Sequence, residues 1–261
     1  MELVVIAIAA FVVSGVTLFS GFGLGTVLMP TFAIFFPVPV AIAATAVVHL
    51  SNNLFKLGLL GRKAEWPVVV RFALPASIAA VLGASTLVVF AEIPVLITYV
   101  LFGDQHDVTM LKLIIGALII GFALVELSPM TSKLTVSGKY LALGGLLSGF
   151  FGGLSGNQGA FRSAFLIKAV RTKEAFVATG VVSAVIVDIT RLTVYGASYV
   201  TSDLAILATD ISGIVLAATL AAFVGAYLAT RLLKKVTYRS VQIIVSIAMI
   251  CVGAGLSAGI I

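Results

Sequence analysis

Long apolar segments alternate with short polar connections along the whole chain. Runs of about 20 apolar residues are each long enough to cross the hydrocarbon core of a bilayer as a helix. Two further apolar segments, 3–37 and 140–170, are interrupted by glycine-rich stretches. We expect each of these to form a re-entrant helical hairpin rather than a crossing. The pattern predicts membrane-crossing helices over 39–60, 67–90, 109–128, 173–195, 203–230 and 240–260.

Composition supports an all-α integral membrane protein. Hydrophobic residues make up 61% of the chain and charged residues only 10%, whereas soluble domains carry about 25% charged residues. The net charge of +6 is typical of basic cytoplasmic loops in a membrane protein. We therefore expect no nucleic-acid partner.

The distribution of charge predicts the topology. Basic residues gather in the connections 56–71, 128–138, 168–173 and 231–239, which the positive-inside rule places in the cytoplasm. The connection 91–108 carries only acidic charges and is expected outside, as is the C-terminus. Both flanks of segment 140–170 are basic, and about 30 residues are too few for two crossings, which need about 40. This segment must therefore return to the side from which it enters.

The chain divides into two halves of the same design, 1–130 and 131–261. Each contains one re-entrant hairpin followed by three crossings, so the second half enters the membrane from the opposite side. This arrangement is an inverted repeat, which is common in secondary transporters. The halves also align at small residues: Ser14-Gly15 with Ser148-Gly149, Gly25 with Gly159, and Thr45 with Thr179.

The two glycine-rich breaks are the predicted substrate site. Interrupted helices in corresponding positions of two repeats mark the binding site in many transporters. Their free backbone N–H groups suit an anion. The alternative is that the glycines only allow close helix packing. The predicted binding residues are Ser20, Gly21, Gly23, Gly25 and Thr26 in the first half, and Ser155, Gly156, Asn157, Gln158, Gly159 and Arg162 in the second.

Polar side chains within the predicted crossings are candidates for gating or proton coupling, because charge is costly in a bilayer. Helical spacing places His49, Asn52, Asn53 and Lys56 on one face. The favoured interpretation of Lys56 is a side chain that snorkels to the cytoplasm. Asp188 and Arg191 are three residues apart and predict an intrahelical ion pair. The gating or coupling candidates are His49, Asn52, Asn53, Asp188, Arg191 and Asp210.

Aromatic residues near the predicted helix ends are expected to form an interfacial belt. These residues are Trp66, Tyr99, Tyr195 and Tyr199.

The chain resembles the sulfite exporter TauE/SafE family of bacterial membrane transporters. The resemblance rests on Ser14-Gly15, on Gly21–Pro30, on Ala43-Ala44-Thr45 and on the second-half echo Ser148–Gly159. It implies transport of a small sulfur-containing or organic anion, such as sulfite or a sulfonate. The family pattern has a proline after both glycine-rich runs, but this chain carries Ala164 in the second half.

We therefore expect a secondary transporter that moves such an anion across the cytoplasmic (inner) membrane by alternating access, as a multi-pass protein without cofactor or metal. Lipid and the anion are its expected partners, and a homodimer is an open alternative to a monomer. The alternative functions are an anion channel and an intramembrane enzyme, for which His49 and Ser155 are the conceivable pair. The chain has no Walker motif, so we expect no ATP-driven transport. The sequence shows no metal-ligand cluster and no paired carboxylates, so we expect no enzymatic activity.

Overall fold

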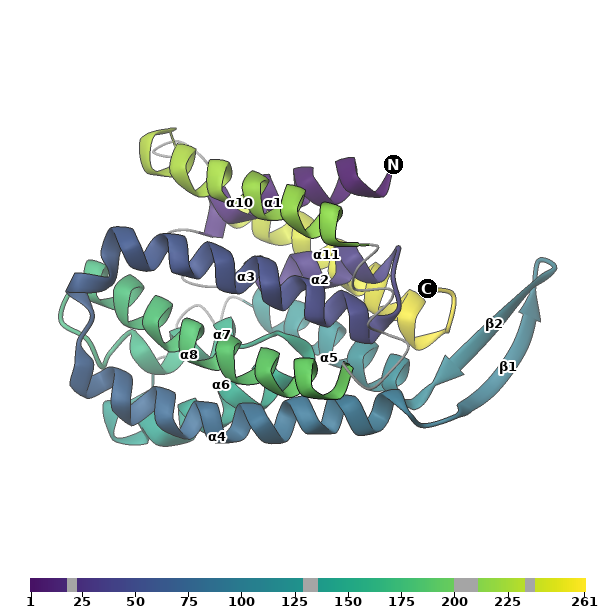
Figure 1. The fold of residues 1–261 in the computed structure, drawn as a ribbon, viewed down its shortest axis with the longest axis horizontal. Helices are drawn as coiled ribbons and strands as arrows, with labels where there is room; N and C mark the ends of the chain where they lie inside the picture. The colour runs from purple at the N-terminus through teal and green to yellow at the C-terminus, as the bar shows by residue number, and fades with distance from the viewer. Residues whose placement is uncertain (18–22, 129–135, 200–210, 233–237) are drawn as a thin grey trace.

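A computed structural model describes residues 1–17, 23–128, 136–199, 211–232 and 238–261. The fold is a helical bundle, as expected for an all-α membrane protein (Figure 1). The first half contains α1 (Glu2–Thr17), α2 (Leu24–Ala33), α3 (Val38–Leu60), the 3₁₀ turn η1 (Gly61–Lys63), α4 (Trp66–Ala91) and α5 (Met110–Leu127). The second half contains the 3₁₀ turn η3 (Gly138–Tyr140), α6 (Leu141–Ser155), α7 (Gly159–Leu166), α8 (Lys173–Tyr199), α10 (Ser212–Leu232) and α11 (Tyr238–Ser257).

Local sequence explains where several helices begin and end. Prolines stand in the first turn of α3 and α4, where a missing N–H costs nothing. Thr109 caps α5 by accepting a hydrogen bond from the backbone N–H of Lys112. Gly156 ends α6 in the left-handed conformation, with φ 81°, which glycine adopts without steric cost. This residue allows the chain to reverse between α6 and α7.

Within the described residues, four helices are long and apolar enough to cross a membrane. They are α3, α4, α5 and α8, and shorter apolar helices accompany them. Many large apolar side chains on their outer faces are exposed, including Leu74, Ile78 and Leu82 on α4. Such faces suit contact with lipid.

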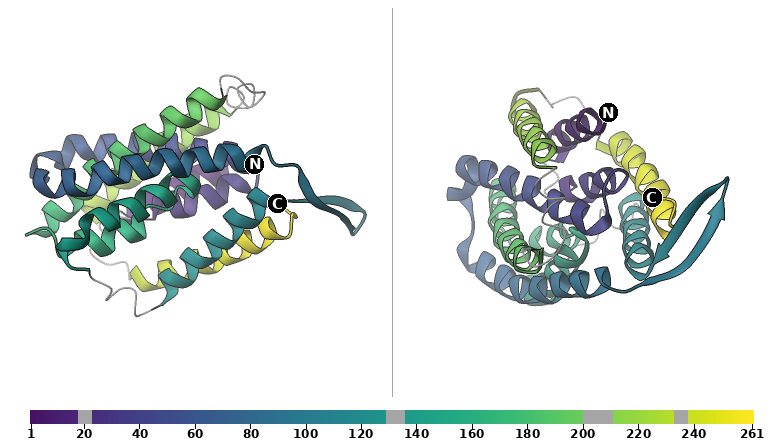
Figure 2. Two further views of the ribbon diagram at one scale, coloured as in Figure 1. Left: turned by 90° about the horizontal axis from the view of Figure 1, so that it is seen from below. Right: turned by 45° about the vertical axis from the view of Figure 1, so that its right-hand side comes forward.

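The helices pack in matching pairs. Helix α1 packs along α10 at one edge of the bundle, and α6 packs along α4 at the opposite edge (Figure 1). Helix α5 packs on α11, and α3 packs on α8 in the centre (Figure 2). Each short helix, α2 or α7, lies beside the long helix that follows it.

Glycines bring α6 and α4 into close contact. Gly145, Gly149 and Gly153 recur every fourth residue on α6, and a Cβ atom on any of them would collide with a backbone carbonyl of α4. Gly225 on α10 approaches the carbonyl of Phe11 on α1 in the same way. The small-residue packing predicted as an alternative role for glycines is therefore real at these helix pairs.

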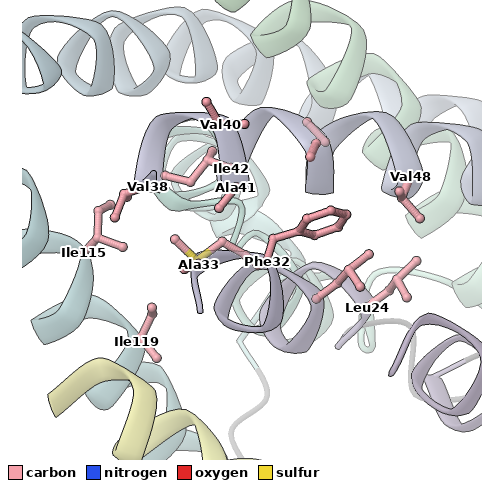
Figure 3. Packing of buried hydrophobic residues seen from close by; sticks show 14 of the residues in the cluster. Leu24, Phe32, Ala33, Val38, Val40, Ala41, Ile42, Val48, Ile115 and Ile119 are labelled. Carbon is pink, nitrogen blue, oxygen red and sulfur yellow. The ribbon is translucent and has the colours of Figure 1, made fainter. Parts of the chain in front are cut away.

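The apolar core surrounds α2. Phe32 of α2 lies beside Ala41 of α3, and Leu24 lies farther along, on the side of Val48 (Figure 3). Side chains of α5, Ile115 among them, complete this cluster. The core therefore fixes α2, whose first residue reaches the candidate site described below.

The connection after α4 contains a β-hairpin that the sequence analysis did not predict. Strand β1 (Val95–Leu101) pairs antiparallel with β2 (Asp104–Thr109). The hairpin projects from the bundle at the end where the C-terminus lies (Figure 1). The run Val-Leu-Ile-Thr-Tyr-Val in β1 is rich in residues that favour strands.

The expected role of Tyr195 in an interfacial belt is wrong. Its side chain is buried, with a relative exposure of 1%, and its hydroxyl donates a hydrogen bond to the backbone carbonyl of Gly153. A buried tyrosine needs such a partner. Hydropathy alone could not distinguish this position from a helix end.

Candidate functional site

The two glycine-rich breaks meet. A Cβ atom on Gly25 in α2 would lie 2.9 Å from the carbonyl oxygen of Gly156, at the end of α6. Gly23, which precedes α2, has φ 120°, a conformation that side chains rarely permit. The glycines at these positions therefore serve close approach and chain reversal. The predicted residues Ser20 and Gly21 lie outside the described residues.

The polar face of α3 points into the bundle. His49, Asn52, Asn53 and Lys56 are all buried, with at most 7% relative exposure. Their spacing places them on one side of the helix, towards α8. Lys56 does not snorkel to the surface as expected, because its side chain is buried and lines a pocket.

Asp188 on α8 is the centre of a buried hydrogen-bond network. Its Oδ1 accepts from Arg191 Nε at 3.0 Å, from Arg191 NH2 at 2.8 Å and from Gln158 Nε2 at 3.0 Å. Its Oδ2 lies 2.6 Å from His49 Nδ1 and accepts from Asn53 Nδ2 at 3.4 Å. The predicted ion pair between Asp188 and Arg191 is confirmed. The network joins α3, α8 and the turn between α6 and α7.

Arg191 also binds the broken helix itself. Its NH1 donates to the carbonyl of Gly152 at 3.2 Å, near the end of α6. Ser148 on α6 donates to the carbonyl of Gln158 at 2.8 Å. Both carbonyls also accept a backbone hydrogen bond, from the N–H groups of Gly156 and Arg162 respectively. The side-chain bonds are therefore additional links that tie α6 and α8 to the second tip.

A pocket opens beside this network. It is lined by the start of α2, the polar face of α3, the second turn of α7 and the first turns of α8. Among the described residues, the lining includes the two basic side chains Lys56 and Arg162 and no carboxylate. Asp188 lies behind His49 and pairs with His49 and Arg191. The polar lining residues are His49, Asn52, Asn53, Lys56, Arg162 and Ser163, with Gly23 at the helix start.

Two of the residues that line this pocket carry buried donors without partners among the described residues. Asn52 Oδ1 accepts from Ser14 at 3.2 Å, which directs the amide Nδ2 elsewhere. That Nδ2 is buried and has no hydrogen-bond partner among the described residues, and the same holds for Ser163 Oγ. A buried donor without a partner costs free energy. A ligand that accepts hydrogen bonds would relieve this cost.

The predicted site residues fall into distinct groups. Gly23 and Arg162 line the pocket, whereas Gly25 and Gly156 form the contact between the tips. Thr26 and Gly159 are buried beside these tips without lining the pocket. Asp210 lies outside the described residues. The predicted coupling residues that do enter the network are His49, Asn53, Asp188 and Arg191.

The side-chain amide nitrogens of the second tip donate hydrogen bonds within the protein. Gln158 Nε2 donates to Asp188, and Asn157 Nδ2 donates to Ser155 Oγ at 3.3 Å. Ser155 Oγ donates in turn to the carbonyl of Phe151. The pair of His49 with Ser155, considered for an intramembrane enzyme, does not form, because His49 contacts Asp188 instead.

The sequence analysis missed Ser163 and gave Lys56 the wrong role. The signal for Lys56 was present, since it continues the helical face of His49 and Asn52. Ser163 carried no signal of its own, because a serine in an apolar helix is common in membrane proteins. Among the described residues, no three His, Cys, Asp or Glu side chains gather closely enough to hold a metal ion.

Comparison with known proteins places the chain in a family. No curated protein and no solved structure matches the chain. The profile of one family, described as "Sulfite exporter TauE/SafE", matches residues 6–256, nearly the whole length. The family comprises membrane transporters of sulfite and similar anions. The chain therefore belongs to the sulfite exporter TauE/SafE family of membrane transport proteins.

Proposed function

We propose that this chain is a secondary transporter that carries a small sulfur-containing anion, such as sulfite or a sulfonate, across the cytoplasmic membrane. The observation that best supports this proposal is the pocket, which is lined by buried Lys56 and Arg162 and by Asn52, whose amide nitrogen has no partner among the described residues. Buried cations and donors of this kind recognise the oxygen atoms of an anion by charge-assisted hydrogen bonds. The start of α2 adds the positive end of a helix dipole.

The apolar part of the lining supports an anion with a small organic group. Leu24, Leu166, Phe176 and Val181 stand opposite or beside the polar residues. A sulfonate presents both an oxygen fan and a short carbon chain. Such a lining accommodates it without burying an unpaired polar group.

The pocket is proposed to face the cytoplasm. The connection after α3 carries Arg62 and Lys63 and is cytoplasmic by the positive-inside rule. Lys56 lies near that end of α3, whereas the network around Asp188 lies deeper in the bundle. The buried network would then close the route to the outside, and its rearrangement would open it in alternating access.

The proposed inverted repeat provides a mechanism for that rearrangement. The packing of α1 on α10 mirrors that of α6 on α4, and α3 with α8 and α5 with α11 would each pair across the pseudo-two-fold axis. Two halves related in this way can exchange conformations, which closes one side while the other opens.

The test is substrate counterflow in proteoliposomes. Vesicles loaded with unlabelled sulfite or methanesulfonate should accumulate the labelled anion transiently, which a channel cannot do. Lys56→Met and Arg162→Gln should each weaken anion affinity by about tenfold or more, as expected for loss of a charge-assisted hydrogen bond.

Matched controls remove a cation from the exposed surface. Lys139→Met and Arg71→Gln should retain wild-type affinity, because both residues are exposed. Wild-type affinity in folded Lys56→Met and Arg162→Gln would contradict the proposed pocket. Absence of counterflow, with dissipation of an anion gradient, would instead indicate a channel.

A further inference from the structure

His49 connects the pocket with the buried network. Its ring lines the pocket, and its Nδ1 lies 2.6 Å from Asp188 Oδ2. Asn53 Nδ2 lies 3.0 Å from the same nitrogen. A histidine whose one nitrogen is held by a carboxylate is oriented to exchange a proton through the other. His49 therefore lies where ligand binding in the pocket can change the protonation of its ring, and with it the charge of the network.

The charges around His49 allow its ring to take up and release a proton. Asp188 and Arg191 form an ion pair that balances to zero. A proton on His49 adds a positive charge to a lining that already contains Lys56 and Arg162. In an empty pocket these three charges would repel one another, in a medium where charge interactions are strong. A bound anion would reverse the balance and favour the protonated ring.

We propose that the proton is the coupling ion of this transporter, and that His49, held by Asp188, binds it together with the anion in the pocket. This inference rests on the proposed function, since it concerns the ion that accompanies the transported anion. Anion and proton would load the same pocket and cross together as a symport. The proton passes from solution to His49 and returns to solution after the conformational change, so no other reactant is consumed.

Other charged groups near His49 do not replace it. Lys56 on α3, Arg162 on α7 and Arg191 on α8 are basic residues without a contact to the His49 ring that the structure shows, whereas Asp188 accepts hydrogen bonds or contacts on both oxygens. Helix α2 contains no charged residue, and the described side chains of α10, 212–228, contain none. Tyr195 on α8 is buried, and its hydroxyl donates to the carbonyl of Gly153 rather than to His49. Other titratable residues described on neighbouring elements are exposed: Arg62, Lys63, Arg71, Lys173, Glu174 and Tyr227.

Linkage fixes the direction of the effect. If anion binding favours protonation of His49, protonation must favour anion binding by the same factor. Affinity should therefore fall as pH rises above the titration of the empty site. The limiting dependence for one coupled proton is about tenfold in affinity per pH unit.

The chain contains two histidines, His49 and His106, so NMR of ¹⁵N-histidine-labelled protein can read this proton directly. His106 lies in the β-hairpin and provides an internal control. At constant pH, saturating sulfite should move the His49 ring signals from the neutral to the imidazolium pattern and leave those of His106 unchanged. A His49 ring that stays neutral, or is already protonated and unchanged on saturation, would overturn the proposal.

A second measurement uses calorimetry of sulfite binding across pH in wild type, His49→Gln and His106→Gln. Protons that sulfite itself gains or loses are common to all three proteins. The difference in slope between wild type and His49→Gln should approach tenfold per pH unit, whereas His106→Gln should match wild type. Equal slopes in wild type and His49→Gln refute the proton site while anion binding stands. Absence of sulfite binding in wild type overturns the proposed function and this inference with it.

Discussion

The two glycine-rich tips, which would occupy corresponding positions in the proposed repeat, contribute different chemistry. The first tip brings the start of α2 to the pocket through Gly23 and Leu24, which offer backbone and an apolar side chain. The second tip brings Arg162 and Ser163, which offer a guanidinium and a hydroxyl. The two tips therefore contribute unequally to the proposed site.

The long helices after the tips show the reverse asymmetry. Helix α3, in the first half, presents Asn52 and Lys56 to the pocket. Helix α8, in the second half, carries Asp188 and Arg191, which neutralise each other behind His49. The polar contributions thus come from the long helix of one half and the broken helix of the other. In the proposed site, the charge for anion recognition would come from positions where the halves differ in sequence rather than from those where they agree.

The largest expected effect is the loss of stability when the Asp188–Arg191 ion pair is broken. Asp188→Asn leaves Arg191 buried without its counter-charge, and loss of one partner from a buried ion pair typically costs about 3–5 kcal/mol. The free energy of unfolding, measured in mixed detergent micelles, should fall by that order.

The matched control is Glu174→Gln, which removes an exposed carboxylate from the first turn of the same helix and should lower stability far less than Asp188→Asn. The double variant Asp188→Leu/Arg191→Met removes both charges and should recover most of the loss. An Asp188→Asn protein as stable as wild type would show that the pair does not hold α8 in place.

The next effect concerns the contact between the tips. Gly25→Val places a side chain where even a Cβ would lie 2.9 Å from the Gly156 carbonyl oxygen. Separation of the tips should lower anion affinity by about tenfold or more, measured by calorimetry. Gly121→Val is the control, because nothing lies within 4 Å of a Cβ at that glycine. Full affinity in a folded Gly25→Val protein would mean that the contact is dispensable for binding.

The smallest expected effect is a change in anion affinity, and it tests whether the first tip contributes a side chain to recognition. Thr26→Val in α2 retains the shape of the side chain and removes the hydroxyl, and Thr26 does not line the pocket. Anion affinity should change by less than about twofold, in contrast to Arg162→Gln at the second tip. A tenfold loss in Thr26→Val would show that the first tip also recognises the anion through a side chain.

Much of the helical fold follows from the sequence, since apolar run length and the position of prolines are local properties. The β-hairpin was missed because its strand-favouring residues form a short run between two long apolar segments. The burial of Tyr195 depends on α6, which comes from a distant part of the chain, and no local pattern records such a contact.

The candidate site was predictable in part. Glycine-rich breaks identified both tips, and helical spacing identified the face of His49 and Asn52. The pairing of His49 with Asp188 joins α3 to α8, and sequence spacing says nothing about partners on different helices. The role of Lys56 depended on whether its long side chain turns inwards, which packing decides.

The central claim is that the anion binds in the pocket between α2, α3, α7 and α8. Selenite is a heavier analogue of sulfite, and its selenium atom can be located in crystals by anomalous scattering. The account predicts a selenium peak within hydrogen-bonding reach of Lys56 and Arg162, and loss of that peak in Arg162→Gln. A peak elsewhere in the bundle, at an anion concentration that supports transport, would contradict it.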